Sequence, residues 1–253
     1  MRKMELKDKV VVVLGASAEG GTGWTIAESF AAEGAKVIVG ARRIEPLREL
    51  ADKIGGLAVA CDGGVPQQIK TMAVAARDAY GPIDVAINSA ATSALGTIAK
   101  ASLEDIQKSI DVNYIGHIYF IRHMAEVMRD GGAITIISTL AASKPVLNFF
   151  PYACAKAALE SLITYAALEY GPRGIRVNSV APGPIRTPMA AGMFDDPAVD
   201  AAYRQQIPLD RVAMAWDIAE AVIRLSEIGY VTGVNLPVSG GMHLNRIPPT
   251  AAP

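Results

Sequence analysis

The run Val10-Val-Val-Val-Leu14 leads directly into Gly15-Ala-Ser-Ala-Glu-Gly20-Gly21-Thr-Gly23, and this junction decides the fold. The β-branched run predicts a strand buried on both faces, and the segment from Thr22 to Glu33, closed by Gly34, predicts a helix. Glycines at a strand-to-helix turn let the backbone approach a pyrophosphate, which the helix N-terminus attracts. The junction therefore predicts a dinucleotide site. The alternative is a tight turn that only needs positive φ.

The alternation of apolar runs and helical segments continues along the chain. Further strand-like runs are Lys36–Val39, Leu57–Ala60, Asp84–Ile87, Ala133–Ser138, Ile175–Val180 and Val234–Pro237. The longest expected helix runs from Ser102 to about Met128. This pattern predicts an α/β protein with a parallel sheet between two helical layers. No linker divides residues 1–253, so we expect one domain, with the Pro/Ala-rich residues 247–253 as a flexible or interface tail.

Composition excludes several classes of function. The chain has 253 residues, and 24 Lys plus Arg against 25 Asp plus Glu leave a formal charge of -1, so no basic field favours nucleic acid or an anionic membrane surface. Every apolar run is broken well before the ~20 residues of a membrane span. Two cysteines and no evident leader predict a cytoplasmic protein. His117, His123 and His243 lack ligand spacing, so no metal site is expected.

Several separate motifs beyond the glycine turn follow one another along the chain. They are Asp62, Asn88-Ser-Ala-Ala91, Asn113, Ser138, Tyr152-Ala-Cys-Ala-Lys156, Pro182-Gly183, Thr232-Gly233 and Gly240-Gly241. With these motifs the chain resembles the short-chain dehydrogenase/reductase family over nearly its whole length. The resemblance implies a three-layer, doubly wound Rossmann fold with a parallel seven-stranded sheet. It also implies a nicotinamide cofactor, which supplies the hydride that none of these side chains can donate.

Tyr152 and Lys156 are four residues apart, which places them on one face of a helix about one turn apart. A cation there would lower the pKa of Tyr152 from about 10 and suit it to acid/base catalysis. Ser138 ends a strand-like run 14 residues before Tyr152, and its hydroxyl could bond the substrate oxygen. The resemblance adds that Lys156 binds the nicotinamide ribose and that Asn113 holds a relay water. The expected catalytic residues are Asn113, Ser138, Tyr152 and Lys156.

The choice between NAD and NADP depends on the end of the second strand, which reads Val39-Gly-Ala-Arg42-Arg43. No carboxylate stands there to bond the ribose hydroxyls, and two guanidiniums could clamp a 2′-phosphate. We therefore expect NADP(H), with NAD(H) as the alternative if these arginines are an ordinary basic loop. The remaining cofactor contacts are implied by the resemblance. The full expected set is Gly15, Ser17, Gly21, Gly23, Arg42, Arg43, Asp62, Asn88, Ala90, Tyr152, Lys156, Pro182, Gly183, Ile185 and Thr187.

The segment after Pro182-Gly183, where the family builds its substrate lid, is rich in large apolar residues. The expected substrate pocket comprises Leu140, Phe149, Met189, Met193 and Phe194. Such walls favour a small hydrophobic ketone or secondary alcohol. The alternative is that the Met and Phe residues of the lid pack on one another.

The sequence leaves two alternative functions open and also bears on how the subunits assemble. Five residues separate Gly15 from Gly21, as in the family's divergent enoyl (C=C) reductases, but those enzymes place six residues between Tyr and Lys and this chain has three. A non-catalytic NADP-binding sensor is a further alternative, since fold does not fix function. The helices that begin near Ser102 and Tyr152 are richly apolar. By resemblance, they imply a homotetramer or homodimer.

Overall fold

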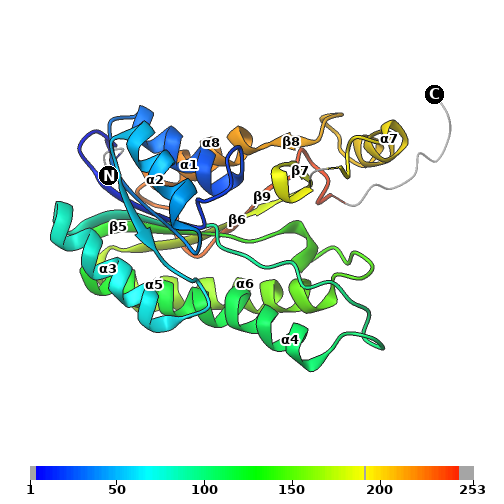
Figure 1. Cartoon of the computed structure of the whole chain (residues 1–253), viewed down its shortest axis with the longest axis horizontal. Coiled ribbons are helices and arrows are strands. Elements are labelled where there is room, and N and C mark those ends of the chain that lie inside the picture. Colours follow the sequence, from blue (N-terminus) through cyan, green and yellow to red (C-terminus); the bar gives the residue numbers. More distant parts are fainter. Residues whose placement is uncertain (1–3, 191, 245–253) are drawn as a thin grey trace.

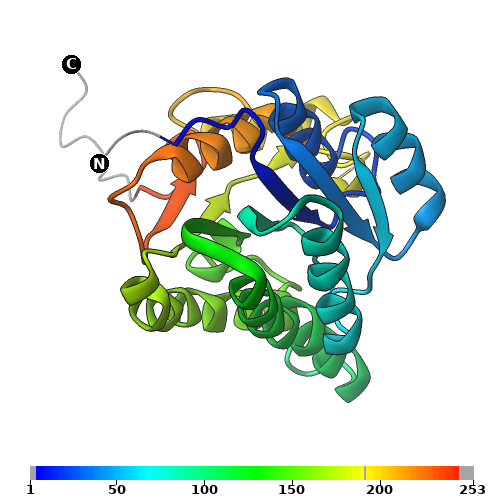
Figure 2. The same ribbon diagram turned by 90° about the vertical axis from the view of Figure 1, so that its left-hand side faces the viewer.

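The computed structural model describes residues 4–190 and 192–244, without the side chain of Met189. Its main sheet has seven parallel strands in the order β3-β2-β1-β4-β5-β6-β9, with helices on both faces (Figures 1 and 2). This confirms the predicted fold class. The strands are β1 Val10–Leu14, β2 Lys36–Ala41, β3 Leu57–Ala60, β4 Ile83–Asn88, β5 Met128–Ile137, β6 Arg176–Pro182 and β9 Asn235–Val238.

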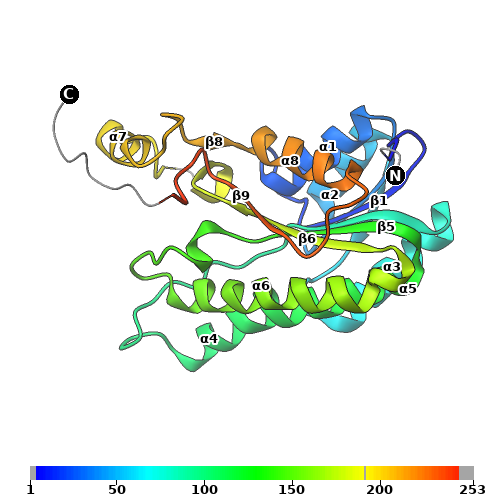
Figure 3. The same cartoon turned by 180° about the vertical axis from the view of Figure 1, so that it is seen from behind.

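Two helical layers enclose the sheet, as Figures 1 and 3 show. On one face lie α1 (Thr22–Ala32), α2 (Ile44–Ile54) and α8 (Ala215–Glu227), and on the other lie α3 (Pro66–Tyr80), α4 (Leu103–Ile110), α5 (Gly116–Val127) and α6 (Phe150–Tyr170). No helix within the described ranges is both long and apolar enough to cross a membrane.

The alternation of side chains along β1 explains why its run is continuously apolar. Val11 and Val13 belong to the core on the α1 and α8 side, while Val10, Val12 and Leu14 belong to the core on the α3, α5 and α6 side. Each of these side chains is therefore removed from water, and each contributes about 1.5–3 kcal/mol of burial free energy.

The long helix expected from Ser102 to Met128 is interrupted, which corrects that prediction. Ser102 does cap α4, since its hydroxyl accepts from Asp105 N at 3.0 Å. A π-helical turn, Asp111–Ile115, then joins α4 to α5, and β5 already begins at Met128. Apolar spacing does not reveal one wider turn, because the apolar face continues through it. Such turns often occur at functional sites, and this one carries Asn113.

A small substructure extends beyond the carboxyl ends of the strands, at the right of Figure 1. The two-residue strands β7 (Ile185–Arg186) and β8 (Ala213–Met214) pair in parallel, and α7 (Pro197–Gln205) lies beside them. Phe194, Ile207 and Val212 form its own small core. We call residues 183–214 the lid. Strands this short have no readable periodicity, so the sequence did not predict them.

Candidate active site

The glycine turn after β1 is shaped by close backbone contacts. A Cβ atom on Gly15 would lie 2.4 Å from Ala90 N, and one on Gly23 would lie 2.3 Å from Gly15 O. Gly15 has a φ of +94°, but the position of Gly23 is fixed by packing of α1 on the turn and not by positive φ. Gly21 is the N-cap of α1 and offers no capping side chain. The turn is thus a bare backbone cradle at a helix N-terminus, and it fits a pyrophosphate.

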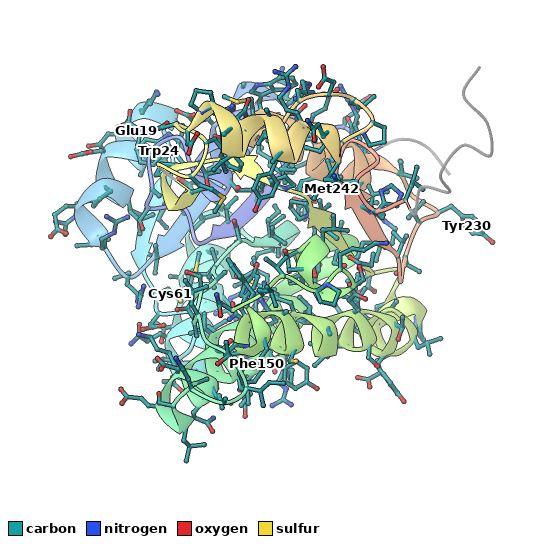
Figure 4. All side chains as sticks on the ribbon, turned by 90° about the vertical axis from the view of Figure 1, so that its right-hand side faces the viewer. Glu19, Trp24, Cys61, Phe150, Tyr230 and Met242 are labelled. Atoms are coloured by element: carbon teal, nitrogen blue, oxygen red, sulfur yellow. The ribbon has the colours of Figure 1, made fainter. Side chains whose placement is uncertain are left out.

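The two arginines that follow β2 are exposed, beside this turn. Arg43 donates through Nη2 to Ser17 O at 2.9 Å and to Ser17 Oγ at 3.3 Å. The strand ends at Ala41, so neutral and cationic side chains occupy the place where a ribose-binding carboxylate would stand. Glu19 is exposed on the same turn, at the outer edge in Figure 4. The arrangement can accept a phosphate on Arg42 and Arg43.

Two predicted cofactor residues stabilise the loops after β3 and β4. Asp62 accepts from Gly64 N at 2.9 Å, and Asn88 Oδ1 accepts from Ala90 N at 2.9 Å. Asn88 Nδ2 is buried and has no hydrogen-bond partner in residues 4–190 and 192–244. Because buried amide groups are normally paired, this donor is available to a ligand or a water.

Tyr152 lies in the first turn of α6 and faces Thr139, which follows β5 by two residues. The Thr139 hydroxyl and the Tyr152 phenol are hydrogen-bonded to each other. Burial raises the pKa of Tyr152, and this hydrogen bond lowers it in part. The expected lowering of that pKa by Lys156 is therefore wrong for this structure, because desolvation disfavours the phenolate.

Ser138, unlike Thr139, does not face Tyr152. Its side chain is 3% exposed, and its hydroxyl is without a hydrogen-bond partner in the described part of the chain. Along β5, Ile134 and Ile136 face α5 and α6, and the same alternation directs Ser138 toward those helices. Thr139 was not predicted from the sequence, although it also carries a hydroxyl and lies one residue nearer to Tyr152 than Ser138 does.

Lys156 is fully enclosed between α6, α5 and β5, with 1% of its side chain exposed. Its Nζ donates to Ile137 O at 2.7 Å and lies 3.1 Å from His117 Nε2. Burial lowers the pKa of Lys156 to about 7 and that of His117 well below its usual value. The amino group therefore exchanges a proton near neutrality.

Asn113 connects three segments of the site through its side chain. Its Nδ2 donates to Thr92 O at 2.9 Å and to Ser109 Oγ at 3.1 Å, and its Oδ1 accepts from Thr92 N at 3.1 Å. Ser109 in turn donates to Pro151 O at 2.9 Å, next to Tyr152. Asn113 thus orients the start of α6, and the relay water stays a prediction.

An apolar cavity of about 190 Å³ opens beside Tyr152 and Thr139. Four of the five expected substrate residues line it, namely Leu140, Phe149, Met193 and Phe194. The side chain of Met189 lies outside the described residues. Lining residues that the sequence did not indicate include Thr139, Ala141, Lys144, Val146 and Met242. Figure 4 looks onto this end of the sheet and labels Met242, below α7.

The lid packs partly on itself while it closes one side of this cavity. Phe194 meets the Tyr203 ring edge to face at 5.4 Å, and it is 7% exposed. Phe194 thus belongs to the lid core and also lines the cavity.

The three histidines have separate partners. His117 contacts Lys156, His123 pairs with Glu126, and His243 bonds Ser239. Among the residues that the structure describes, no group of three or more His, Cys, Asp or Glu side chains is placed to hold a metal ion.

The chain matches known proteins both in sequence and in structure. A family model described as enoyl-(acyl carrier protein) reductase matches residues 15–243. The 3beta-hydroxysteroid dehydrogenase 1 of Eggerthella lenta is 36% identical over 251 residues, 95% of each chain. A short-chain type dehydrogenase/reductase of Mycobacterium ulcerans has a TM-score of 0.91 at 27% identity, over 96% of this chain and 92% of that one. The chain is a short-chain dehydrogenase/reductase.

A further relative of this short-chain dehydrogenase/reductase is the mitochondrial borneol dehydrogenase of Lavandula x intermedia. It is 32% identical over 245 residues, 94% of this chain and 92% of the relative. The family and its named dehydrogenases make this protein an oxidoreductase that uses NAD(P)(H). The resemblance stated from the motifs is thereby confirmed.

Proposed function

We propose that this short-chain dehydrogenase/reductase uses NADP(H) to interconvert a small hydrophobic ketone and its secondary alcohol. The observation that carries the proposal is the hydrogen-bonded pair of Tyr152 and Thr139 hydroxyls in the wall of an apolar cavity. The cavity of about 190 Å³ lies below the roughly 300–1,000 Å³ of drug-sized ligand sites, which favours a compact substrate. Two relatives are named for a hydroxysteroid and for borneol, both alicyclic alcohols.

In the reduction, Tyr152 serves as the acid. Its raised pKa keeps the phenol protonated at neutral pH, so that it can donate this proton to the carbonyl oxygen. The Thr139 hydroxyl bonds the same oxygen and stabilises the charge that develops on it. Lys156, with its pKa of about 7, returns a proton to Tyr152. The bound nicotinamide supplies the hydride.

The residues proposed to hold the cofactor surround the carboxyl ends of the strands. Gly15, Ser17, Gly21 and Gly23 form the pyrophosphate cradle, which side chains at Gly15 and Gly23 would fill. Asp62 would contact the adenine ring, and Asn88 and Ala90 would line the cofactor cleft. The residues that would bracket the nicotinamide carboxamide are Pro182, Gly183, Ile185 and Thr187. Lys156 and Tyr152 would hold the nicotinamide ribose.

Replacing Arg42 with alanine is expected to weaken NADPH binding about 10- to 100-fold and to leave NADH binding nearly unchanged. The reason is that a charge-assisted hydrogen bond to the 2′-phosphate is worth about 1.5–3 kcal/mol. Fluorescence titration with each cofactor measures both constants. Arg48→Ala, which removes an exposed arginine from α2, is the matched control and should change neither. An equal loss for both cofactors would contradict an NADP preference.

Turnover tests the function itself. The purified protein is expected to oxidise NADPH in the presence of alicyclic ketones and to oxidise NADH more slowly at equal concentration. Tight NADPH binding without turnover across a broad panel of apolar ketones and enones would overturn the reductase proposal in favour of the sensor.

Reduction of a C=C bond is the second candidate. The five-residue spacing between Gly15 and Gly21 favours it, as does the match to a family model described as enoyl-(acyl carrier protein) reductase. The three-residue spacing between Tyr152 and Lys156 opposes it, because the enoyl reductases that share the long glycine turn place six residues there. We therefore place the carbonyl reaction first.

We also propose a cytoplasmic homotetramer or homodimer. Cys61 and Cys154 are both free thiols, as expected in a reducing compartment. Leu103 on α4 and Tyr165 and Leu168 on α6 are exposed apolar side chains on the helices expected to associate. Light scattering of the purified protein measures the assembly.

A further inference from the structure

A buried histidine contacts the catalytic lysine, and the mechanism above gives it no role. His117 is the second residue of α5, directly after the π-helical turn, and none of its side chain is exposed. Its Nε2 lies 3.1 Å from Lys156 Nζ, across the interface of α5 with α6. A buried imidazole beside a buried amine is costly unless the two share a hydrogen bond.

The chemistry of the two groups fixes the direction of this bond when Lys156 is charged. An ammonium has three donors and no acceptor, so Lys156 donates to Ile137 O and to His117 Nε2. His117 must then be neutral, with its proton on Nδ1. Nδ1 is itself buried without a hydrogen-bond partner in the described ranges. The tautomer that accepts from Lys156 through Nε2 therefore leaves its own N–H unpaired there.

The groups that face Lys156 leave His117 as its titratable contact. On α6, Tyr152 lies one turn earlier and bonds Thr139, and Glu160 lies one turn later and accepts from Asn235. On β5 the facing groups are the Ile137 carbonyl and the Ser138 hydroxyl, which do not titrate.

The neighbouring elements add no charge at Lys156. In the π-helical turn Asp111 accepts from Gln107, and Asn113 bonds Thr92. On β4 the polar group at the carboxyl end is the neutral Asn88 amide. Burial alone accounts for the lowered pKa of Lys156, so no described charge compensates its desolvation.

We propose that His117 is a positioning residue that accepts a hydrogen bond from Lys156 and so holds its amino group in the protonated state one helical turn from Tyr152. The role of Lys156 in returning a proton rests on the proposed function, but the contact itself does not. Removal of the acceptor should make the buried ammonium lose its proton at a lower pH.

The test is an NMR titration of the cofactor-free protein labelled with ¹³C at lysine Cε, with Lys156→Arg to assign the signal. His117→Leu replaces the imidazole with an apolar side chain of similar size that has no acceptor. In this variant the titration midpoint of Lys156 is expected about 1 to 2 pH units below that of the wild type. His117→Gln, which retains an acceptor oxygen, should restore most of the midpoint. His123→Leu, on the same helix, is the matched control and should leave it unchanged.

An unchanged or raised midpoint in His117→Leu would overturn the proposal. If that variant does not fold, His117→Asn replaces it, because its shorter amide does not reach Nζ, and the same midpoint shift is expected. The pH profile of kcat/KM should move to lower pH together with the NMR midpoint. A midpoint shift in a protein without turnover would uphold the role of His117 and count against the proposed function instead.

Discussion

Replacing Tyr152 with phenylalanine is expected to lower kcat for ketone reduction about 10²- to 10⁴-fold, because the substrate oxygen loses its proton donor. The ring remains, so its edge-to-face contact with Phe149, with ring centroids 6.5 Å apart, and the packing of α6 are retained. Because the variant also loses the hydroxyl proposed to hold the nicotinamide ribose, NADPH affinity should fall by about tenfold or less, the value of one hydrogen bond. Steady-state NADPH oxidation gives kcat, and fluorescence titration gives the dissociation constant.

The matched control for this variant is Tyr203→Phe. Tyr203 also presents its side chain to the cavity, but it belongs to the lid and packs on Phe194. Its phenol is not next to Thr139, and its loss should alter kcat only slightly. Comparable losses in both variants, or more than a tenth of wild-type kcat in Tyr152→Phe, would refute the assignment of Tyr152 as the acid.

The second large effect is expected from Thr139→Val, which removes a hydroxyl and keeps the size of the side chain. Loss of one donor to the developing oxyanion should reduce kcat about 10²- to 10³-fold. Thr139→Ser should retain most of the activity. Ser138→Ala should change kcat little, because the Ser138 hydroxyl does not line the cavity. Kinetics of the three variants with one ketone decide which of the two hydroxyls bonds the substrate oxygen. A large loss of kcat in Ser138→Ala together with a small loss in Thr139→Val would assign this bond to Ser138.

The inner strands of the sheet could be predicted from the sequence because they are buried on both faces. Runs such as Val10–Leu14 are apolar at every position and are bounded by glycine or charge, so the strand ends were located within two residues, except that β5 begins at Met128 and not at Ala133. β7 and β8 were not predicted, because their position depends on lid contacts and not on a local pattern. The π-helical turn was missed for a related reason, since one extra residue leaves the apolar face intact.

The candidate site was predicted in its residue types more than in its contacts. The spacing of Tyr152 and Lys156 places them on one helix face, but it does not specify what Lys156 Nζ bonds. That depends on Ile137 and His117, which come from two other elements. Likewise, the choice between Ser138 and Thr139 depends on which way the chain turns as it leaves β5. A one-residue change there moves the hydroxyl from the helix side into the cavity wall.

Transfer of deuteride to a cyclic enone tests the central claim most directly. The protein is incubated with an apolar enone and NADPH that carries deuterium at C4 of the nicotinamide, with each C4 stereoisomer in turn, and the product is analysed by NMR. The proposed function predicts an allylic alcohol with deuterium on the carbinol carbon and the C=C bond intact. A saturated ketone with deuterium on the β-carbon would contradict it and identify the protein as an enoyl reductase.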